Sequence, residues 1–415
     1  MNRFEPLSRR AVIGATAAAA VAVAVPSSAQ AACGIDQSAI DTATARVEDA
    51  LIALRRDLHA HPEGSGDEER TASLVAELLT DAGLRATTGV GGHGVVGVLK
   101  GRRPGRTVAY RADMDAVPAE EQGGAGPEHL CGHDLHTAIG VGVAQVLAGL
   151  RHRLSGTVVF FFQPAEESLE GAAAMIADGV LERYDPEEIH AIHCGPFPLG
   201  VLAVMPGSGL PGLDRGTVNL TGPDAPARAE ALAADIAALN TVAFPETPAD
   251  IDRLMADVQT PDGPLSEFVV MRAFPTESAV ELSYRCWPED RYTEVREAVA
   301  ALAADHGATA DFPADPFPAL VCPEREAREL ERHLRKATGR TSTAVMHAPF
   351  PFNGEDYALF MDELPGTFSF LGVLAPGADI ATAAPHFPTF DPDERAIAHG
   401  VRAMSGWLAR RTAGR

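Results

Sequence analysis

An uninterrupted apolar run, Thr157 to Phe162, limits most strongly what this chain can fold into. A strand without a polar face must be buried on both sides, as in a parallel sheet covered by helices. Two shorter β-branched runs, 94–99 and 107–110, come before it, and an apolar segment of helical length, 135–150, separates them from it. This alternation predicts an α/β fold with a mainly parallel sheet flanked by helices.

The length and the later pattern predict a second domain. A chain of 415 residues exceeds what one hydrophobic core usually organises. After Gly216 the elements follow the order β-α-β-β-α-β, which is typical of a ferredoxin-like α+β unit. We therefore expect residues 41–215 and 315–412 to form one domain, and residues 216–314 to form an inserted one.

The first residues resemble an export signal. Arg9 and Arg10 precede an uncharged apolar run, 11–25, and Ala29-Gln30-Ala31 supplies the small-x-small pattern of a cleavage site. The paired arginines favour the twin-arginine route, so residues 1–31 predict an exported protein. A membrane anchor is the alternative, but the run is shorter than the roughly 20 residues of a spanning helix. A lipoprotein attached through Cys33 is a further alternative.

The charge and the cysteines exclude several classes of protein. The net charge is -23, which repels nucleic acid and anionic membranes, so we expect neither as a partner and no stable membrane span. The 5 cysteines are too few and too scattered for a disulfide framework in a chain of this size. At most one or two bridges are expected.

Two short motifs carry metal-binding chemistry. Cys131-Gly132-His133-Asp134 precedes the apolar helical segment, and a thiolate two residues from an imidazole commonly holds a borderline metal. A buried cysteine beside a capping aspartate is the alternative. Glu166 and Glu167 follow the buried strand at its carboxyl end, where open α/β sheets place ligands. Adjacent carboxylates there need a metal or a proton for compensation, unless they belong to a solvated acidic loop.

Four further polar residues indicate a binding site only when they are considered together. His193 ends an apolar strand-like run, and His386 lies between two prolines near the carboxyl terminus. A lone histidine is more often structural than a ligand. Asp113 and Asp115 follow the strand at 107–110, and alternate carboxylates on a strand face the same side, where they could bind a metal or orient a ligand.

Taken together, the motifs resemble the hippurate hydrolase and auxin-conjugate hydrolase group. This group belongs to the larger aminoacylase and carboxypeptidase family of dinuclear metallohydrolases. The resemblance extends in order over nearly the whole chain after the signal-like segment. It rests on five segments: Leu58 to Glu63, Arg111 to Pro118, Cys131 to Ala138, Gln163 to Glu167 and Gly354 to Tyr357.

The resemblance implies a zinc-peptidase-like catalytic domain whose inserted domain is a lid that also forms a homodimer. It implies a small amide substrate, such as an N-acyl amino acid. It also implies two divalent ions, manganese or zinc, with cobalt or nickel as alternatives. By position, Glu166 matches the general base, and the metal ligands fall on Cys131, His133, Glu167, His193 and His386. Residues that would orient ligands or contact substrate are Asp113, Asp115, Asp134, His136 and Arg285.

The chain departs from the family pattern in the inserted domain. The family has a lid histidine that stabilises the oxyanion and a lid asparagine, whereas the matching segments here, 220–226 and 274–278, contain neither. Loss of an oxyanion donor commonly lowers turnover on the order of 100-fold to 1000-fold. Two alternatives therefore stand beside the amidohydrolase: a catalytically impaired metal-containing binding protein, and an exported carboxypeptidase or aminopeptidase.

Overall fold

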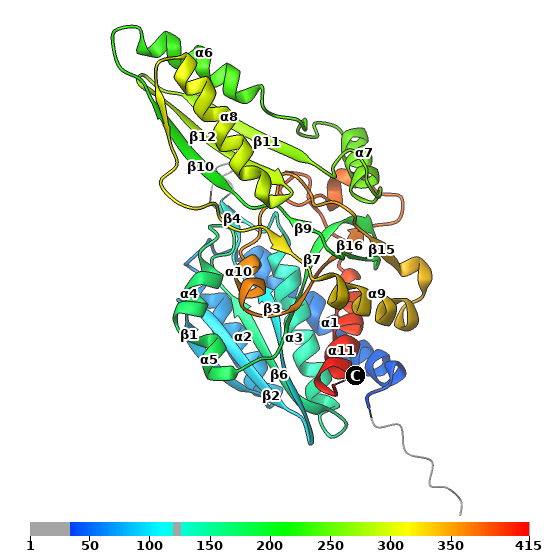
Figure 1. Cartoon of the computed structure of the whole chain (residues 1–415). Coiled ribbons are helices and arrows are strands. Elements are labelled where there is room, and N and C mark those ends of the chain that lie inside the picture. Colours follow the sequence, from blue (N-terminus) through cyan, green and yellow to red (C-terminus); the bar gives the residue numbers. More distant parts are fainter. Residues whose placement is uncertain (1–33, 119–125, 415) are drawn as a thin grey trace, which may run out of the picture. The chain divides into compact units, whose positions relative to one another are not determined.

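The computed structural model describes residues 34–118 and 126–414, and its largest element is an eight-stranded sheet (Figure 1). The pairs β3–β6, β3–β7, β7–β16 and β8–β15 are parallel, which confirms the mostly parallel sheet. The remaining pairs, β1–β2, β2–β6 and β8–β16, are antiparallel. In spatial order the strands are β1 (Arg85–Val90), β2 (Gly94–Lys100), β6 (Ser155–Gln163), β3 (Arg103–Asp113), β7 (Ile189–Pro198), β16 (Gly366–Leu374), β8 (Leu202–Val204) and β15 (Thr343–Val345).

Helices cover both faces of this sheet, as the apolar character of β6 requires. Phe160 and Phe162 pack into the core on one face, and Val159 and Phe161 pack into the core on the other. The first face carries α1 (Gln37–Ala60), α2 (Glu69–Asp81), α3 (His133–Gly149) and α11 (Ala396–Thr412). The second carries α4 (Gly171–Ala177), α5 (Val180–Tyr184) and α10 (Tyr357–Glu363).

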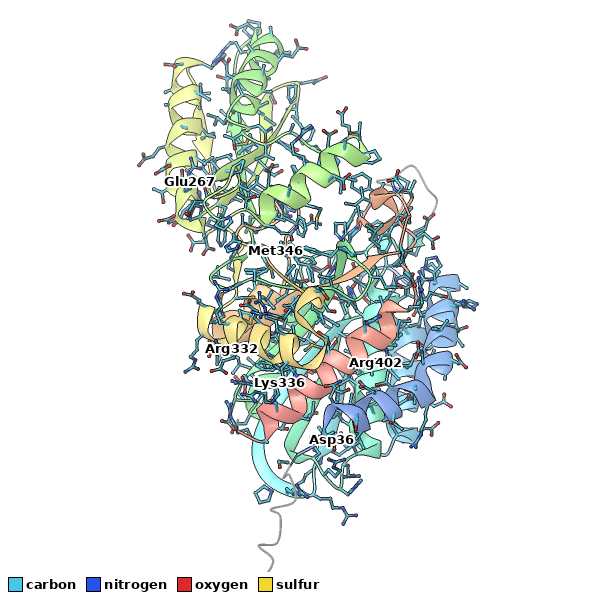
Figure 2. All side chains as sticks on the ribbon, turned by 90° about the vertical axis from the view of Figure 1, so that its right-hand side faces the viewer. Asp36, Glu267, Arg332, Lys336, Met346 and Arg402 are labelled. Carbon is cyan, nitrogen blue, oxygen red and sulfur yellow. The ribbon has the colours of Figure 1, made fainter. Side chains whose placement is uncertain are left out.

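Helix α9 (Glu324–Ala337) packs beside α11. Figure 2 shows the two helices next to each other, with Arg332 and Lys336 on α9 and Arg402 on α11. Leu330 and Leu334 of α9 belong to the same core as Trp407 of α11. None of the described helices is long and apolar enough to cross a lipid bilayer.

A second, four-stranded sheet lies within the predicted insert and is antiparallel throughout. Its order is β11 (Phe268–Pro275), β12 (Ala279–Trp287), β10 (Asp214–Asn219) and β13 (Thr309–Asp311). Helices α6 (Ala225–Ala237) and α8 (Tyr292–Asp305) pack on one of its faces around a separate core. We refer to these four strands as the insert sheet. The described residues fall in one compact unit, so the domain boundaries at residues 215 and 314 stay a prediction.

One helix of this region was not expected from the sequence. Helix α7 (Pro248–Val258) follows a proline-rich stretch and begins at a capping box, in which Thr247 and Asp250 satisfy each other's backbone amides. Its apolar residues Ile251 and Met255 pack into the core of the large sheet, not into the core of the insert sheet.

Short elements connect the two sheets. Leu213 and Phe317 form a backbone bridge, and β9 (Gly209–Leu210) pairs with β14 (Leu320–Val321). The chain therefore enters and leaves the insert sheet through two segments that pair with each other. The other short elements are β4 (Val117–Pro118), β5 (Pro127–Glu128) and the 3-10 helices Glu289–Arg291, Arg340–Ser342 and Ile380–Ala383.

Candidate metal centre and substrate pocket

The expected general base and four of the expected metal ligands lie at or near the carboxyl ends of the central strands. Glu166 and Glu167 follow β6, His193 lies on β7, and Cys131 and His133 lie at the start of α3. All of these residues except His133 border one pocket of about 790 Å³, which also reaches the insert sheet. This is the edge at which open α/β sheets bind ligands, because strand ends and helix starts leave polar groups there.

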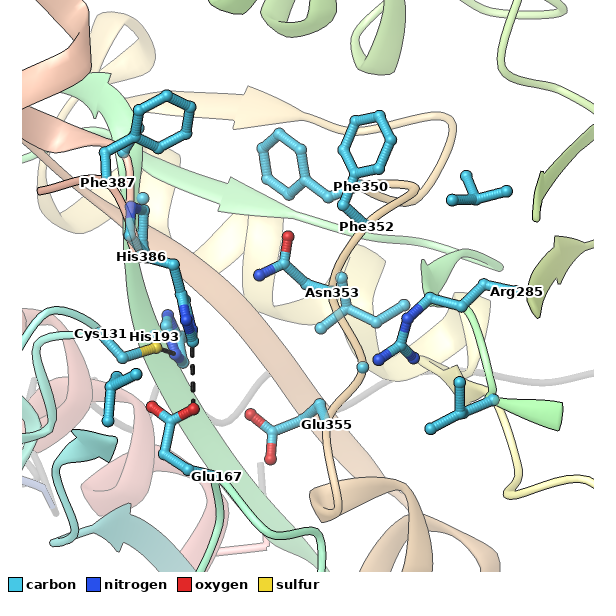
Figure 3. A pocket seen from close by; sticks show the side chains of 18 of the residues that line it. Cys131, Glu167, His193, Arg285, Phe350, Phe352, Asn353, Glu355, His386 and Phe387 are labelled. Carbon is cyan, nitrogen blue, oxygen red and sulfur yellow. Dashed lines mark hydrogen bonds and ion pairs between the residues drawn. The ribbon is translucent and has the colours of Figure 1, made fainter. Parts of the chain in front are cut away.

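The structure brings the five expected ligands together, and Figure 3 shows four of them: Cys131, Glu167, His193 and His386. Cys131 Sγ lies 3.3 Å from His193 Nε2. Glu167 lies between the other two imidazoles, with one carboxylate oxygen 3.6 Å from His133 Nε2 and the other 3.6 Å from His386 Nε2. Glu166 is adjacent, 3.8 Å from His133 Nε2.

The unpaired atoms of this cluster fit divalent cations. His133 Nε2 and Glu167 Oε1 are buried and have no hydrogen-bond partner among the described residues. The opposite ring nitrogens are occupied: His133 Nδ1 lies 2.9 Å from the carbonyl oxygen of Asp115, and His193 Nδ1 lies 2.8 Å from that of Cys194. A ring that donates through Nδ1 presents a lone pair at Nε2, which is the arrangement of a metal-binding histidine.

The pKa values of the acidic groups in this cluster are raised, because several negative charges would be buried close together without a cation. Burial raises the pKa of Glu166 well above its usual range, and the negative charges of Glu355 and Glu167 add to the effect. Burial also raises the pKa of Glu167 and of the Cys131 thiol. Bound cations would oppose all three shifts by favouring the ionised forms.

Asp115 positions His133. Its carboxylate lies 3.1 Å from His133 Nδ1 and accepts hydrogen bonds from the Ser65 hydroxyl at 2.7 Å and the Glu167 amide at 2.9 Å. One fully buried carboxylate therefore fixes an imidazole and the backbone of a second candidate ligand.

Asp113 positions His136, and His136 has no free nitrogen for a metal. His136 Nδ1 lies 2.6 Å from Asp113, and the backbone amide of Cys194 donates to His136 Nε2 at 2.8 Å. Asp113 also forms an ion pair with the buried Arg111. His136 thus supports the backbone beside the cluster, whereas Asp113 also borders the cluster, with its second carboxylate oxygen 3.9 Å from His133 Nε2.

Asp134 does not reach the pocket. Its carboxylate lies 2.9 Å from Arg55 Nε and 2.9 Å from His59 Nδ1, so it ties α3 to α1. Although burial opposes ionisation, the positive charge of His129 and the hydrogen bond from His59 lower the pKa of Asp134 to about 2. Asp134 therefore supports the helix that begins at His133 and does not orient a ligand directly.

Backbone geometry at the ligands is unusual. His386 has a φ of 65° and Ala165, just before Glu166, a φ of 52°, values that side-chain-bearing residues rarely adopt. Gly132 has a φ of 89°, and a Cβ atom there would lie 2.4 Å from Cys194 Sγ, so only glycine fits between the two ligands of this motif. Such conformations persist where the surroundings enforce them, as at binding sites.

The far wall of the pocket contains residues that sequence reasoning missed, together with Arg285, which it had named. Arg215, Arg272 and Arg285 come from the insert sheet, and Asn353 extends from the segment before α10. Figure 3 shows the Asn353 carboxamide between Glu355 and the aromatic side chains Phe350 and Phe352. No histidine of the insert lines the pocket in the described part of the chain, in agreement with the missing lid motif.

The sequence profile of peptidase family M20/M25/M40 matches residues 109–410. The chain belongs to this family. The M20 protein is 30% identical over 373 residues to the putative amidohydrolase YhaA of Bacillus subtilis, covering 86% of this chain and 93% of that one. It is 30% identical over 363 residues to N-acetylcysteine deacetylase of the same organism, covering 84% and 93%.

Among solved structures, the M20 protein is similar to the YXEP protein of Bacillus subtilis, described as a dinuclear metal binding peptidase from the M20 family. The identity is 26%, the TM-score is 0.68, and the match covers 89% of this chain and 99% of that one. The family, the fold and the enzyme class expected from the sequence are thus confirmed: the protein is a metal-dependent hydrolase of amide bonds.

The expectation of export by the twin-arginine route is wrong. YhaA, N-acetylcysteine deacetylase and N-acetyldiaminopimelate deacetylase of Enterococcus faecalis are cytoplasmic enzymes, and each aligns with 84% to 87% of this M20 protein. The expectation rested on a short alanine- and valine-rich run after paired arginines, within residues 1–31, which lie outside the described residues.

The four described cysteines, Cys131, Cys194, Cys286 and Cys322, are free and buried. The M20 protein therefore forms no disulfide among its described residues. A free thiol at Cys131 is compatible with a ligand role, because a thiolate must be unpaired to bind a metal.

Proposed function

We propose that this enzyme removes the acyl group from N-acyl amino acids, with Glu166 as the general base beside two divalent cations. Cys131, His133, Glu167, His193 and His386 would hold the cations. The observation that carries the proposal is the convergence of these donors around His133 Nε2 and Glu167 Oε1, which are buried and have no protein partner among the described residues. Thiolate, imidazole and carboxylate donors together suit manganese or zinc.

When bound, divalent ions of this kind polarise a carbonyl group and make nearby water more acidic. Glu166 is buried, borders the pocket and makes no hydrogen bond to another described side chain. A carboxylate in this position accepts a proton from the attacking water. It then returns that proton to the amine nitrogen as the carbon–nitrogen bond breaks. Without cations, burial and nearby negative charge raise the pKa of Glu166, and bound cations would favour the ionised form that accepts a proton.

Asn353 is our candidate for the donor that replaces the absent lid histidine. Its carboxamide extends into the pocket and makes no hydrogen bond within the described residues, so its N–H groups are free for an oxyanion. A side-chain amide serves as an oxyanion donor in other hydrolases. We also propose that the insert acts as a lid and joins two copies of the chain, as in the family that the sequence resembles.

The test is a substrate panel with metal-loaded protein. N-acetyl amino acids, N-benzoyl amino acids and dipeptides are compared by release of free amine, and Glu166→Gln is the control. The proposal expects turnover of the N-acyl amino acids, and retained metal with at least 100-fold lower turnover in Glu166→Gln, roughly the contribution of a general base.

Other outcomes separate the alternatives. Preference for dipeptides would favour a peptidase, a class also represented by thermostable carboxypeptidase 1 of Saccharolobus solfataricus, which is 31% identical over 351 residues. Tight ligand binding by metal-loaded protein without turnover on any substrate would instead favour the binding protein.

A further inference from the structure

Three arginines lie on one face of the insert sheet. Ser283 of β12 pairs with Arg215 of β10 on one side and with Arg272 of β11 on the other. Arg285 lies two residues further along β12, and alternate residues of a strand point to the same side of a sheet. The three guanidinium groups therefore extend from a single face, around Ser283. We call Arg215, Arg272 and Arg285 the arginine face.

The arginine face borders the substrate pocket. The opposite face of the same strands, including Val218, Met271 and Leu282, packs against α6 and α8. Arg215, Arg272, Ser283 and Arg285 all line the pocket that also contains Cys131 and Glu167. In Figure 3, Arg285 lies across the pocket from Glu167 and His386, with Glu355 between them.

These arginines have no anionic partner in the described part of the chain. No ion pair joins any of them to a carboxylate within residues 34–118 and 126–414, and Arg285 Nη1 donates only to the carbonyl oxygens of Gly212 at 3.1 Å and Pro211 at 3.4 Å. Glu281, on the same face of β12, also makes no ion pair with them. Other arginines of the insert do pair: Arg228 with Asp224, Arg253 with Asp250, Arg291 with Glu294 and Arg296 with Asp214.

Without a ligand, the arrangement is costly for Arg285, whereas Arg215 and Arg272 are exposed to solvent. The chain has 57 acidic side chains against 34 basic ones, so three unpaired cations beside a catalytic pocket are not a consequence of composition. Burial lowers the pKa of Arg285 to about 10, and repulsion from Arg272 and Arg215 contributes. A bound anion would relieve this repulsion, and the planar guanidinium group binds carboxylates through two parallel hydrogen bonds.

We propose that the preferred substrate is an N-acylated acidic amino acid, in which the arginine face binds two carboxylates. One arginine is enough to bind the main-chain carboxylate that every N-acyl amino acid has. The other two arginines would bind a second carboxylate on the side chain of the substrate. The inference rests on the proposed deacylase function and specifies its substrate class.

The experiment compares matched substrates with metal-loaded enzyme. N-acetylglutamate is paired with N-acetylglutamine, and N-acetylaspartate with N-acetylasparagine, because each pair has nearly the same shape and differs in one charge. We expect kcat/KM to be on the order of 10- to 100-fold higher for the acid, mainly through KM, as for hydrogen bonds to charged groups. In the double variant Arg215→Gln/Arg272→Gln the preference should disappear while N-acetylglutamine is still cleaved. Arg253→Gln on α7 is the control and should leave the ratio unchanged.

Equal kcat/KM for acid and amide in the wild-type enzyme would overturn the inference and leave the proposed function intact. So would an unchanged ratio in the double variant. If no amide is cleaved, the proposed function fails, and the arginine face is then tested alone by calorimetric titration with glutarate. Glutarate binding that is lost in the double variant supports the face as a dicarboxylate site, and absence of binding by the wild-type protein overturns it.

Discussion

The backbone amide of His386 donates a 2.8 Å hydrogen bond to the carbonyl oxygen of Leu130, the residue before Cys131. This bond joins two candidate ligand loops that are far apart in the sequence. It also holds His386 at a φ of 65°, in the left-handed region. The loop thus presents an imidazole to Glu167 at the expense of backbone strain.

Two substitutions of His386 test whether its backbone is strained, independently of the role of its imidazole as a ligand. His386→Ala and His386→Gly both remove the imidazole, and both keep the amide that bonds to Leu130. Since glycine adopts positive φ without steric cost, we expect metal-free His386→Gly to be about 1 kcal/mol more stable than His386→Ala. Urea unfolding measures the difference. A glycine variant that is equally stable or less stable would show that the loop relaxes when the ring is removed.

Substitution of Asp115 should weaken metal binding without removing a ligand. Asp115→Asn keeps the size of the side chain, but it cannot accept all the hydrogen bonds from Ser65, the Glu167 amide and His133. Loss of such a supporting carboxylate typically lowers metal affinity about 10- to 100-fold. Competition with a chelator of known affinity measures the change. Ser65→Ala removes one of the three hydrogen bonds and serves as the milder control, so equal losses in both variants would contradict the assigned role.

Asn353 offers a test of the missing lid donor. Asn353→Ala should lower kcat about 100-fold with a smaller effect on KM, because an oxyanion donor acts mainly in the transition state. Asn353→Asp, which has nearly the same shape but lacks the N–H donors, should be at least as impaired. Steady-state kinetics on the best N-acyl amino acid measures both variants. Wild-type turnover in Asn353→Ala would assign the donor to another group.

Glu188 should control stability at acidic pH. Its carboxylate is buried and pairs with Arg106 and Arg411 at 2.6 Å each, which joins β3 to the end of α11. Burial opposes ionisation, but the His190 imidazole, 3.6 Å away, and the hydrogen bonds from Arg411 outweigh it and lower the pKa of Glu188 to about 2. Because this folded-state pKa lies below the ordinary value of 4.5, the stabilisation is present above pH 4.5 and is lost as the pH falls towards 2.

We therefore expect Glu188→Gln to reduce the free energy of unfolding by about 3 kcal/mol at neutral pH. The variant should also show a flatter decline between pH 4.5 and 2. Chemical unfolding at a series of pH values measures both effects. Glu187→Gln is the matched control, since Glu187 also pairs with Arg106 but its side chain is 52% exposed. That change should cost less than about 1 kcal/mol.

The sequence predicted those parts of the fold and site that depend on local patterns. The apolar run ending at Phe162 specified a strand buried on both faces, and the polar residues after it fall at the pocket as expected. His193 and His386 have no local signature, and only the resemblance over the whole chain connected them to Cys131. Helix α7 was hidden by the prolines before it, although its capping residues Thr247 and Asp250 are a recognisable signal.

Other features depend on information that a single sequence does not contain. Arg215 and Arg272 become neighbours of Ser283 only through strand register, and a shift of one residue would place them on the opposite face. The orientation of Asp134 was likewise not predictable. Its position next to His133 suggested a role at the cluster, but consecutive residues at a helix start point in different directions, and Asp134 faces Arg55.

The bridge between Leu213 and Phe317 brings together the two ends of the segment between them. This segment therefore leaves the large sheet and returns to it at the same place. Apart from the residues that pack into the core of the large sheet, such as those of α7, residues of this segment can be exchanged, added or deleted without altering the pairing of β16 with β7, the strand that carries His193. The recognition of substrates can therefore diverge among related proteins while the chemistry at the strand ends is inherited unchanged.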